Sequence, residues 1–204
     1  VPEGAYNIGA NGEKAARNTT ADIDITTKTD KSGIDIKIKP NTKNQSVHIP
    51  VVISESGLKE VVYNDFFVGE DSDVVIIAGC GIHNCGTQAS QHDGVHRFFV
   101  GKNSKVKYVE KHYGEGDGTG ERILNPTTEV YLEENSYMEM EMVQIKGVDS
   151  TKRLTTAKLD KGAKLIVRER LMTHGNQFAE STYNTELNGE NSGADIVSRS
   201  VAKD

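Results

Sequence analysis

Phe99-Val100-Gly101-Lys102-Asn103-Ser104-Lys105-Val106-Lys107-Tyr108 is one copy of a pattern that recurs along this chain of 204 residues. Each copy has two apolar residues, a short acidic or Gly/Asn turn, and then alternating apolar positions. The second apolar positions of the five copies are Val68, Val100, Leu132, Leu159 and Leu187, which lie 32, 32, 27 and 28 residues apart. A repeat of this length, built from strands and turns without a helical period, is typical of a solenoid whose coils bury their inward faces on one another.

The pattern therefore predicts an all-β fold, a β-helix, rather than the β-sandwich that also uses many short alternating strands. Alternation in stretches 106–109, 138–142 and 165–167 is expected to send every second side chain into a narrow core. On the same argument the methionines at 138, 140 and 142 are predicted to pack in the core rather than to form a thioether metal site.

The N-terminal part changes character along its length. Residues 1–20 are polar and rich in Gly and Asn, so we expect an irregular lead-in that packs little. Between residues 21 and 39, isoleucines at 23, 25, 34, 36 and 38 alternate with polar residues around Asp30-Lys31-Ser32-Gly33, which predicts a β-hairpin. Further strands are expected at 47–53 and 61–63, and residues 1–204 are expected to form a single domain.

Composition excludes several classes of function. Lys and Arg number 24 against 30 Asp and Glu, and this acidic balance disfavours nucleic acid and anionic membranes as partners. No run of 18 apolar residues and no signal-peptide pattern occur, and two cysteines are too few for a disulfide framework, so we expect a cytoplasmic protein with free thiols. Aromatic residues make up only 6% of the chain and Trp is absent, which disfavours a carbohydrate-active enzyme.

Both cysteines, Cys80 and Cys85, and three histidines, His83, His92 and His96, lie within residues 79–96, predicted as a loop between strands ending near 77 and starting at 97. Thiolates and imidazoles suit soft metals, but the cysteines are five apart with no second pair, so no metal site is predicted. One cysteine could instead act as a nucleophile or sulfur carrier whose thiol is tuned by the imidazoles. Two buried cysteines acting as small apolar residues are the remaining alternative.

Three other histidines are interpreted without a role in binding. His112 precedes an acidic Gly-rich stretch, 111–121, that lacks the ligand spacing of a calcium loop or a phosphate loop, and a flexible solvent-facing turn is expected there. His48 and His174 are isolated and are predicted to be structural.

The segment Gly79-Cys80-Gly81-Ile82-His83-Asn84-Cys85-Gly86-Thr87, the later His92 and His96, and the closing residues 197–204 resemble the SufB/SufD family. These proteins are scaffold subunits of the SUF iron–sulfur cluster assembly machinery. The resemblance extends in layout over nearly all of the chain and is greatest to a short archaeal or clostridial SufB-like form. It implies a right-handed parallel β-helix and a scaffold that is not an enzyme by itself.

The resemblance also implies roles for single residues. The SufB pattern has a Gly-Cys-Thr segment with a histidine eleven residues after the cysteine, a spacing that Cys85 and His96 match. Cys85 is therefore the expected acceptor of persulfide sulfur, Cys80 a secondary thiol, and His83, His92 and His96 groups that tune the thiol or relay protons. This sequence departs from the pattern in Cys85-Gly86-Thr87 and in the additional upstream cysteine.

Partners follow from the same resemblance. They are a SufC-type ABC ATPase, a second SufB/SufD subunit in a homodimer or heterodimer, and a cysteine desulfurase or sulfur-transfer protein. The family's cluster-building residues and its helical ATPase-docking segment lie beyond the point that matches residue 204, so an iron–sulfur cluster is expected only transiently in the full complex and not stably on this chain. The alternative is a structural metal-binding or protein-interaction β-solenoid without sulfur chemistry.

Overall fold

The structure is a computed structural model that describes residues 2–204. Within that range every regular element is a strand. The strands are β1 (Ala5–Ala10), β2 (Glu13–Asn18), β3 (Ile23–Thr27), β4 (Gly33–Ile38), β5 (Lys43–Ile53), β6 (Lys59–Val68), β7 (Asp73–His83), β8 (Ser90–Val100), β9 (Lys105–Glu115), β10 (Arg122–Leu124), β11 (Thr127–Leu132), β12 (Tyr137–Gln144), β13 (Ser150–Leu159), β14 (Lys164–His174), β15 (Phe178–Leu187) and β16 (Gly193–Lys203).

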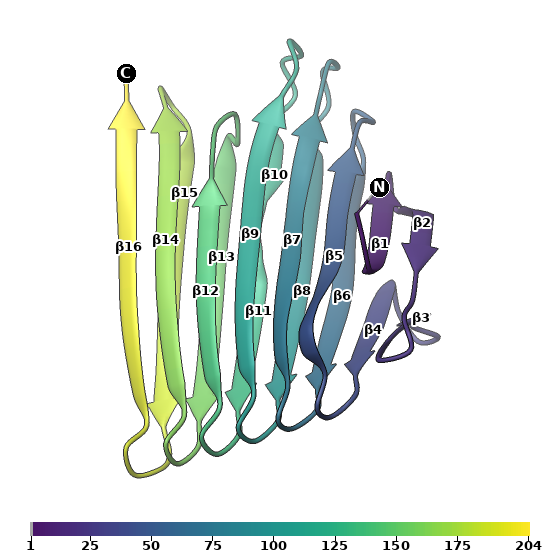
Figure 1. Ribbon diagram of the computed structural model, residues 1–204. Coiled ribbons are helices and arrows are strands. Elements are labelled where there is room, and N and C mark those ends of the chain that lie inside the picture. Colours follow the sequence, from purple (N-terminus) through teal and green to yellow (C-terminus); the bar gives the residue numbers. More distant parts are fainter. Residues whose placement is uncertain (1) are drawn as a thin grey trace.

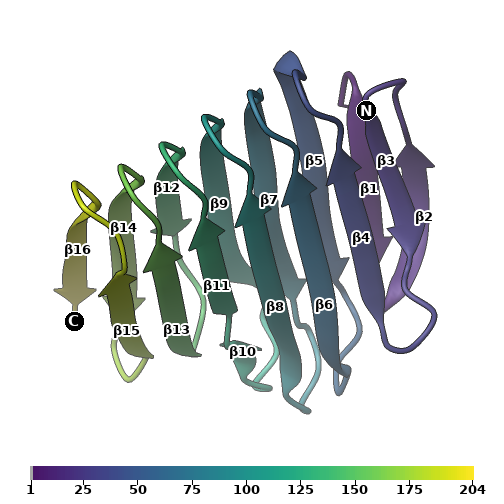
Figure 2. The same ribbon diagram turned by 90° about the horizontal axis from the view of Figure 1, so that it is seen from below.

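The strands form two facing sheets that the chain enters alternately, as Figure 1 and Figure 2 show. Sheet A has the order β16-β14-β12-β9-β7-β5-β1-β2, and sheet B contains β10, β13, β11, β8, β6, β4 and β3, with β15 paired to β13. From β4 onward each strand pairs in parallel with the strand one coil away. This is a β-solenoid of about six turns, so the prediction of a β-helix is confirmed.

The register of sheet B follows the sequence repeat residue by residue. Val68 pairs with Val100, Val100 with Leu132, Leu132 with Leu159, and Leu159 with Leu187. The five repeat positions therefore form one column along the solenoid axis, in which Val68, Val100, Leu132 and Leu159 are buried, while Leu187 on the last coil is exposed. The irregular spacing of 27 to 32 residues reflects coils of different length that keep the same register.

The core is filled from both sheets by alternate residues. Met138, Met140 and Met142 are buried on β12, which confirms their predicted place in the core. Opposite them, Phe66 and Phe98 stack inside the solenoid with ring centroids 4.6 Å apart. Burying one such side chain stabilises the fold by roughly 1.5–3 kcal/mol, so the short core of each coil depends on its stacked neighbours.

The turns from sheet B to sheet A, which we call the lower turns (39–42, 69–72, 101–104, 133–136, 160–163 and 188–192), share one geometry and lie along the bottom of Figure 1. Each contains one residue with positive φ: Asn41, Asp71, Asn103, Asn135, Gly162 and Asn191. Asn, Asp and Gly tolerate this left-handed conformation better than other residues. The amide of this residue donates to a carbonyl of the next coil, as Asn103 N does to Glu134 O at 3.1 Å, so the turns hold the coils in register.

The opposite connections, from sheet A to sheet B, are less regular. We call them the upper loops, and they comprise residues 54–58, 84–89, 116–121, 145–149 and 175–177. In Figure 1 they stand along the top of the solenoid, at the end away from the lower turns.

At the N-terminus one prediction is confirmed and another is wrong. The hairpin is β3–β4, in which Ile23 pairs with Ile38 and Ile25 with Ile36. Residues 1–20 were predicted to be irregular, yet β1 and β2 form an antiparallel pair and β1 extends sheet A alongside β5. The edge backbone of β5 supplies hydrogen bonds to β1, and this pairing outweighs the weak apolar alternation of the segment.

Candidate functional site

The predicted cysteine–histidine loop is shorter than its sequence suggests. Strand β7 continues to His83 and β8 begins at Ser90, so the expected strand limits near 77 and 97 are wrong and the loop comprises only 84–89. The strands continue because polar residues replace apolar ones without interrupting the in–out alternation.

Loop 84–89 is held firmly by its own side chains and by both neighbouring upper loops. Asn84 is fully buried; its Nδ2 donates to Gln88 O at 2.8 Å, and its Oδ1 accepts from Gly86 N at 2.9 Å. From the preceding coil, Ser56 Oγ donates to Gln88 O at 2.9 Å. The backbone of the loop therefore holds Cys85 in a fixed position.

The glycines of the following upper loop, 116–121, allow its backbone to pack closely against loop 84–89. A Cβ placed on Gly116 would lie 2.3 Å from Asn84 O, and one on Gly118 would lie 2.5 Å from the carbonyl carbon of Cys85. Gly118 N and Gly120 N donate to Asn84 O and Gly86 O at 3.1 and 3.0 Å. Of the stretch 111–121, residues 111–115 continue β9 and only 116–121 form the predicted turn, which stacks on the cysteine loop instead of standing free in solvent.

Cys85 is exposed at this rim and has an acid–base partner. Its Sγ lies 3.1 Å from His83 Nε2, and His83 Nδ1 lies 3.4 Å from Glu115 Oε1 in the next coil. We call these three residues the rim triad. An imidazole at this distance can take up the thiol proton, and a carboxylate on its other nitrogen orients the ring. Of the three histidines expected to tune the thiol, only His83 lies within contact distance of Cys85.

Cys80 lies on the other side of the sheet, inside the solenoid. It is buried on β7, in register with Val51 on β5 and His112 on β9. Burial raises the pKa of the Cys80 thiol, and the charges of Glu60 and Glu110 raise it further. The thiol is therefore protonated at neutral pH and a weaker nucleophile than an exposed one.

His92 and His96 also point inward, so the prediction of one loop that contains all three histidines is wrong. They line a small cavity of about 20 Å³ together with Cys80, Glu110 and His112. His92 Nδ1 lies 2.6 Å from Glu60 Oε1, and His96 Nδ1 lies 3.1 Å from Tyr108 Oη. The structure thus separates the predicted residues into a rim pair, Cys85 and His83, and an interior group, Cys80, His92 and His96.

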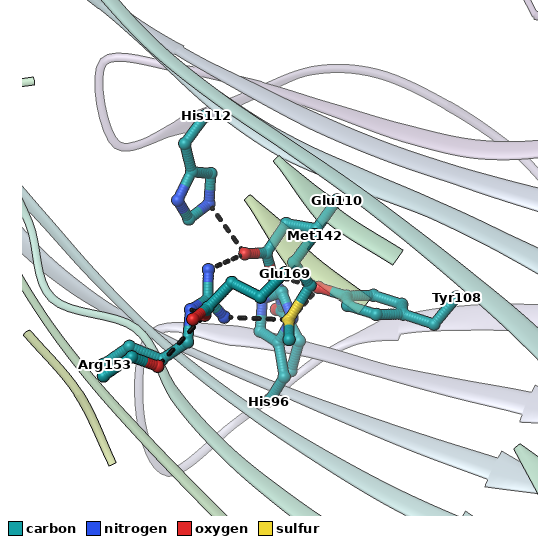
Figure 3. Close-up of polar contacts among 9 residues, drawn as sticks. His96, Tyr108, Glu110, His112, Met142, Arg153 and Glu169 are labelled. Atoms are coloured by element: carbon teal, nitrogen blue, oxygen red, sulfur yellow. Dashed lines mark hydrogen bonds and ion pairs between the residues drawn. The ribbon is translucent and has the colours of Figure 1, made fainter. Parts of the chain in front are cut away.

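The interior group continues into a buried network that sequence reasoning missed (Figure 3). Glu110 accepts hydrogen bonds from Arg153 and Tyr108 and lies 3.4 Å from His112 Nε2. Arg153 Nε also lies 3.2 Å from Glu169 Oε2, so a single guanidinium joins two carboxylates that are almost fully buried. We call Glu110, Arg153 and Glu169 the interior ion cluster.

Burial and charge fix the protonation of this region. Burial opposes ionisation of Glu110, but the Arg153 guanidinium outweighs it and holds the pKa of Glu110 below its usual range. Burial lowers the pKa of His112 to about 4, against the opposing charge of Glu110, and the pKa of His96 to about 4 for the same reasons. The imidazoles of His96 and His112 are therefore neutral at pH 7 and are weak bases.

Several interior polar atoms have no hydrogen-bond partner. Asn64, His96, Thr128, Thr155 and Tyr183 occupy one register row of sheet B, running along the axis. Asn64 Oδ1, Thr128 Oγ1, Thr155 Oγ1 and Tyr183 Oη are buried and unpartnered. Buried polar groups are normally hydrogen-bonded, so four unpartnered polar groups in one row indicate an interior that favours polar molecules such as water.

His48 and His174, predicted to be structural, lie outside both groups. His48 is half-buried on the outer face of β5, with Nδ1 unpartnered, and His174 is exposed at the end of β14. Among residues 2–204 no group of three or more His, Cys, Asp and Glu side chains is arranged to hold a metal ion. Within the same range there is no helix of the length and apolarity needed to cross a membrane.

Comparison with known proteins gives two matches. Residues 55–204 match the family described as "SUF system FeS cluster assembly, SufBD core domain". A protein of Archaeoglobus fulgidus described as "Iron-sulfur cluster assembly SufBD family protein" is 30% identical over 177 residues, which cover 85% of this chain and 46% of the relative. The chain thus spans about half the length of the curated relative it matches. No solved structure matches it.

Proposed function

Since this chain belongs to the SufB/SufD family of the SUF iron–sulfur cluster assembly system, we propose that it is a scaffold subunit that accepts persulfide sulfur at Cys85. The general role in iron–sulfur assembly follows from the family. The choice of Cys85 is carried by one observation: its thiol is exposed, 3.1 Å from the His83 imidazole, whereas Cys80 is buried.

The reaction is thiol–persulfide exchange. Cys85 transfers its proton to His83 and attacks the outer sulfur of a donor persulfide; a new bond forms between Cys85 Sγ and that sulfur, while the bond to the donor's inner sulfur breaks. The donor leaves as a thiolate, which takes the proton from His83, so no external oxidant or reductant is needed. Glu115 lies beside His83 Nδ1 and stabilises the imidazolium that forms during transfer.

The interior residues suggest where the sulfur goes next. Cys80 lies five residues earlier on the same segment but faces inward, into the small cavity that His92, His96 and His112 also line. Beyond it, the row from Asn64 to Tyr183 offers unpartnered polar atoms along the axis. We propose that Cys80 takes the sulfur from Cys85 by a second thiol–persulfide exchange, in which the bond to Cys85 Sγ breaks and Cys85 leaves as a thiolate. A thiol supplied by further parts or subunits then receives the sulfur at the assembly site, and the polar half of the core solvates the route between them.

The partners of the proposal are a cysteine desulfurase or sulfur-transfer protein as donor, a second SufB/SufD subunit, and a SufC-type ABC ATPase. The iron–sulfur cluster is the cargo of such an assembly. The subunit does no catalysis by itself in this scheme, and the ATPase supplies the conformational work.

Transfer of ³⁵S-labelled sulfur from a cysteine desulfurase tests the acceptor. We expect Cys85→Ser to abolish label on the protein and Cys80→Ser to retain it, because Cys85 accepts first. His83→Gln should slow transfer by roughly 100- to 10,000-fold, the range typical of a lost proton-transfer partner. His174→Gln is the matched control, since it removes another exposed histidine at the upper rim. Unaltered labelling of Cys85→Ser protein would refute Cys85 as acceptor.

A further inference from the structure

A second, larger cavity opens at the N-terminal end of the solenoid. It has a volume of about 250 Å³ and lies among the β1–β2 pair, the turn of the β3–β4 hairpin, and the inner faces of β5 and β6. The rim triad does not line it. A cavity of this size accommodates a small organic molecule.

The charges around the cavity favour an anion. Four cationic side chains line it against two carboxylates, those of Glu13 and Glu60. Lys28 is held by ion pairs to Asp35 and Asp65, but Lys14, Arg17 and Lys31 have no ion-pair partner among residues 2–204. Unneutralised cations at the mouth of a cleft raise the local concentration of small anions.

The wall of the cavity contains an unused hydrogen-bond acceptor. Asn64 is only 6% exposed, and its Oδ1 has no partner, while its Nδ2 lies 3.3 Å from His96 Nε2. An unsatisfied buried acceptor destabilises the unliganded protein, and a donor group on a ligand would satisfy it. The apolar side chains of Ile34 and Ile49 lie along the same cavity and suit the hydrocarbon part of a ligand.

The same wall borders the cavity that contains Cys80. Ile49, Val51 and Asn64 line both spaces. Gly94 keeps the inner space open, because a Cβ on this residue would lie 3.3 Å from His92 Nε2 and 3.5 Å from His96 Nε2. A ligand whose anionic end lies near Lys14 and Lys31, at the mouth of the N-terminal cavity, would direct its other end past Asn64 toward the Cys80 thiol.

We propose that this N-terminal cavity binds a small organic anion that bears a persulfide or its parent thiol, and that it supplies sulfur directly to Cys80. Cys80 attacks the outer sulfur of the ligand, the bond between the ligand's two sulfurs breaks, and the inner sulfur leaves as a thiolate that takes the Cys80 proton. Cys80 becomes a persulfide and the ligand a thiol, so electrons balance without an oxidant. The inference rests on the proposed sulfur chemistry but adds a route independent of Cys85.

Binding is tested by calorimetry with 3-mercaptopropionate, under reducing conditions, on the whole chain. We expect saturable binding, and binding at least about tenfold weaker for neutral 3-mercapto-1-propanol and for the Lys14→Gln/Lys31→Gln variant, because charge recognition is lost. Both lysines are exposed, so the variant should fold. Lys146→Gln, an exposed lysine outside the cavity, is the control and should bind normally. Equal binding of the neutral thiol, or no binding at all, overturns the site.

Transfer is tested with the persulfide of 3-mercaptopropionate and Cys85→Ser protein. Mass spectrometry should find one added sulfur on Cys80 and none in the Cys80→Ser/Cys85→Ser variant. Gly94→Ala should slow the transfer while leaving thiol binding intact, because it narrows only the inner space. Failure to label Cys80 overturns the route. Labelling here together with failure of desulfurase transfer to Cys85 would instead refute the proposed function alone.

Discussion

Replacing Arg153 by Met tests whether the interior ion cluster is balanced by a single guanidinium. In the native protein the side chains of Arg153, Glu110 and Glu169 are 6%, 3% and 1% exposed, so no solvent can compensate a lost charge. Removing one partner of a buried ion pair typically costs about 3–5 kcal/mol, because the remaining charge stays desolvated. Here two carboxylates lose the same cation, so we expect a loss of free energy of unfolding at the upper end of that range.

Guanidinium chloride unfolding, followed by far-ultraviolet circular dichroism at pH 7, measures this loss as a lower midpoint at unchanged slope. Neutralising all three positions, as Glu110→Gln/Arg153→Met/Glu169→Gln, should recover more than half of it, since replacing a whole buried cluster by neutral groups is often close to neutral. Arg170→Met removes an exposed arginine of β14 and should change stability by no more than about 0.5 kcal/mol.

The loss of free energy of unfolding caused by Arg153→Met should also become smaller as the pH is lowered. Arg153 holds the pKa of Glu110 below its usual range, so without it burial favours the protonated acid in the folded state. The folded variant then binds protons more readily than the unfolded chain, and acid stabilises it relative to the native protein. A loss below about 1 kcal/mol at pH 7, or a deficit that grows in acid, would refute the assigned charge balance.

Three further changes probe the core, the turns and the interior histidine by the same unfolding assay. Met140→Ala removes a fully buried side chain and should cost about 2–5 kcal/mol; a cost under about 1 kcal/mol would contradict its place in the core. Asn103→Ala should cost about 1 kcal/mol because Asn103 has φ +58°, whereas Asn103→Gly should be nearly neutral; equal effects would argue against a left-handed turn. His112 has a folded pKa of about 4 against an ordinary value of 6.5, so the unfolded chain takes up its proton first as pH falls, and stability should drop between about pH 6.5 and 4 by up to about 3 kcal/mol. His112→Gln should flatten that part of the pH profile, and an unchanged profile would contradict a buried neutral imidazole.

The fold could be predicted largely because the residues that repeat in the sequence are the residues that pair between neighbouring coils. The column from Val68 to Leu187 was visible as a spacing, and neighbouring coils need only align it to bury their inward faces. Strands β1 and β2 were missed for the opposite reason. Strand β1 is held by backbone pairing to β5, a partner more than thirty residues away, and β2 is held by pairing to β1. Little in Ala5–Ala10 itself alternates.

Only part of the candidate site could be predicted, because the rim pair depends on local sequence and the interior group depends on the fold. Cys85 and His83 lie two residues apart, so their contact follows from the chain itself. The interior group was misplaced although the signal for it was present. On β8 the even-numbered residues from Ser90 to Val100 face inward, so His92 and His96 share the parity of the core residue Phe98.

The same parity argument would have located the interior ion cluster. Glu110 continues the series of Val106 and Tyr108, and Glu169 continues that of Leu165 and Val167. Both glutamates lie beyond the stretches 106–109 and 165–167 for which an inward alternation was predicted. What parity alone does not supply is the partner, because Arg153 reaches across from the opposite sheet and its contact depends on how the two sheets face each other.

The lower turns have a consequence for how this protein can vary. In each, the residue of positive φ stands two positions before the next strand of sheet A begins, although successive ones are 30, 32, 32, 27 and 29 residues apart. Apart from one additional residue in the last turn, 188–192, the differences in coil length lie away from these turns, at the upper ends of the strands and in the upper loops. Insertions or deletions there alter the outline around Cys85 without changing which residues face the interior. The upper loops around Cys85 can therefore differ between relatives while the stacked coils and their register stay the same.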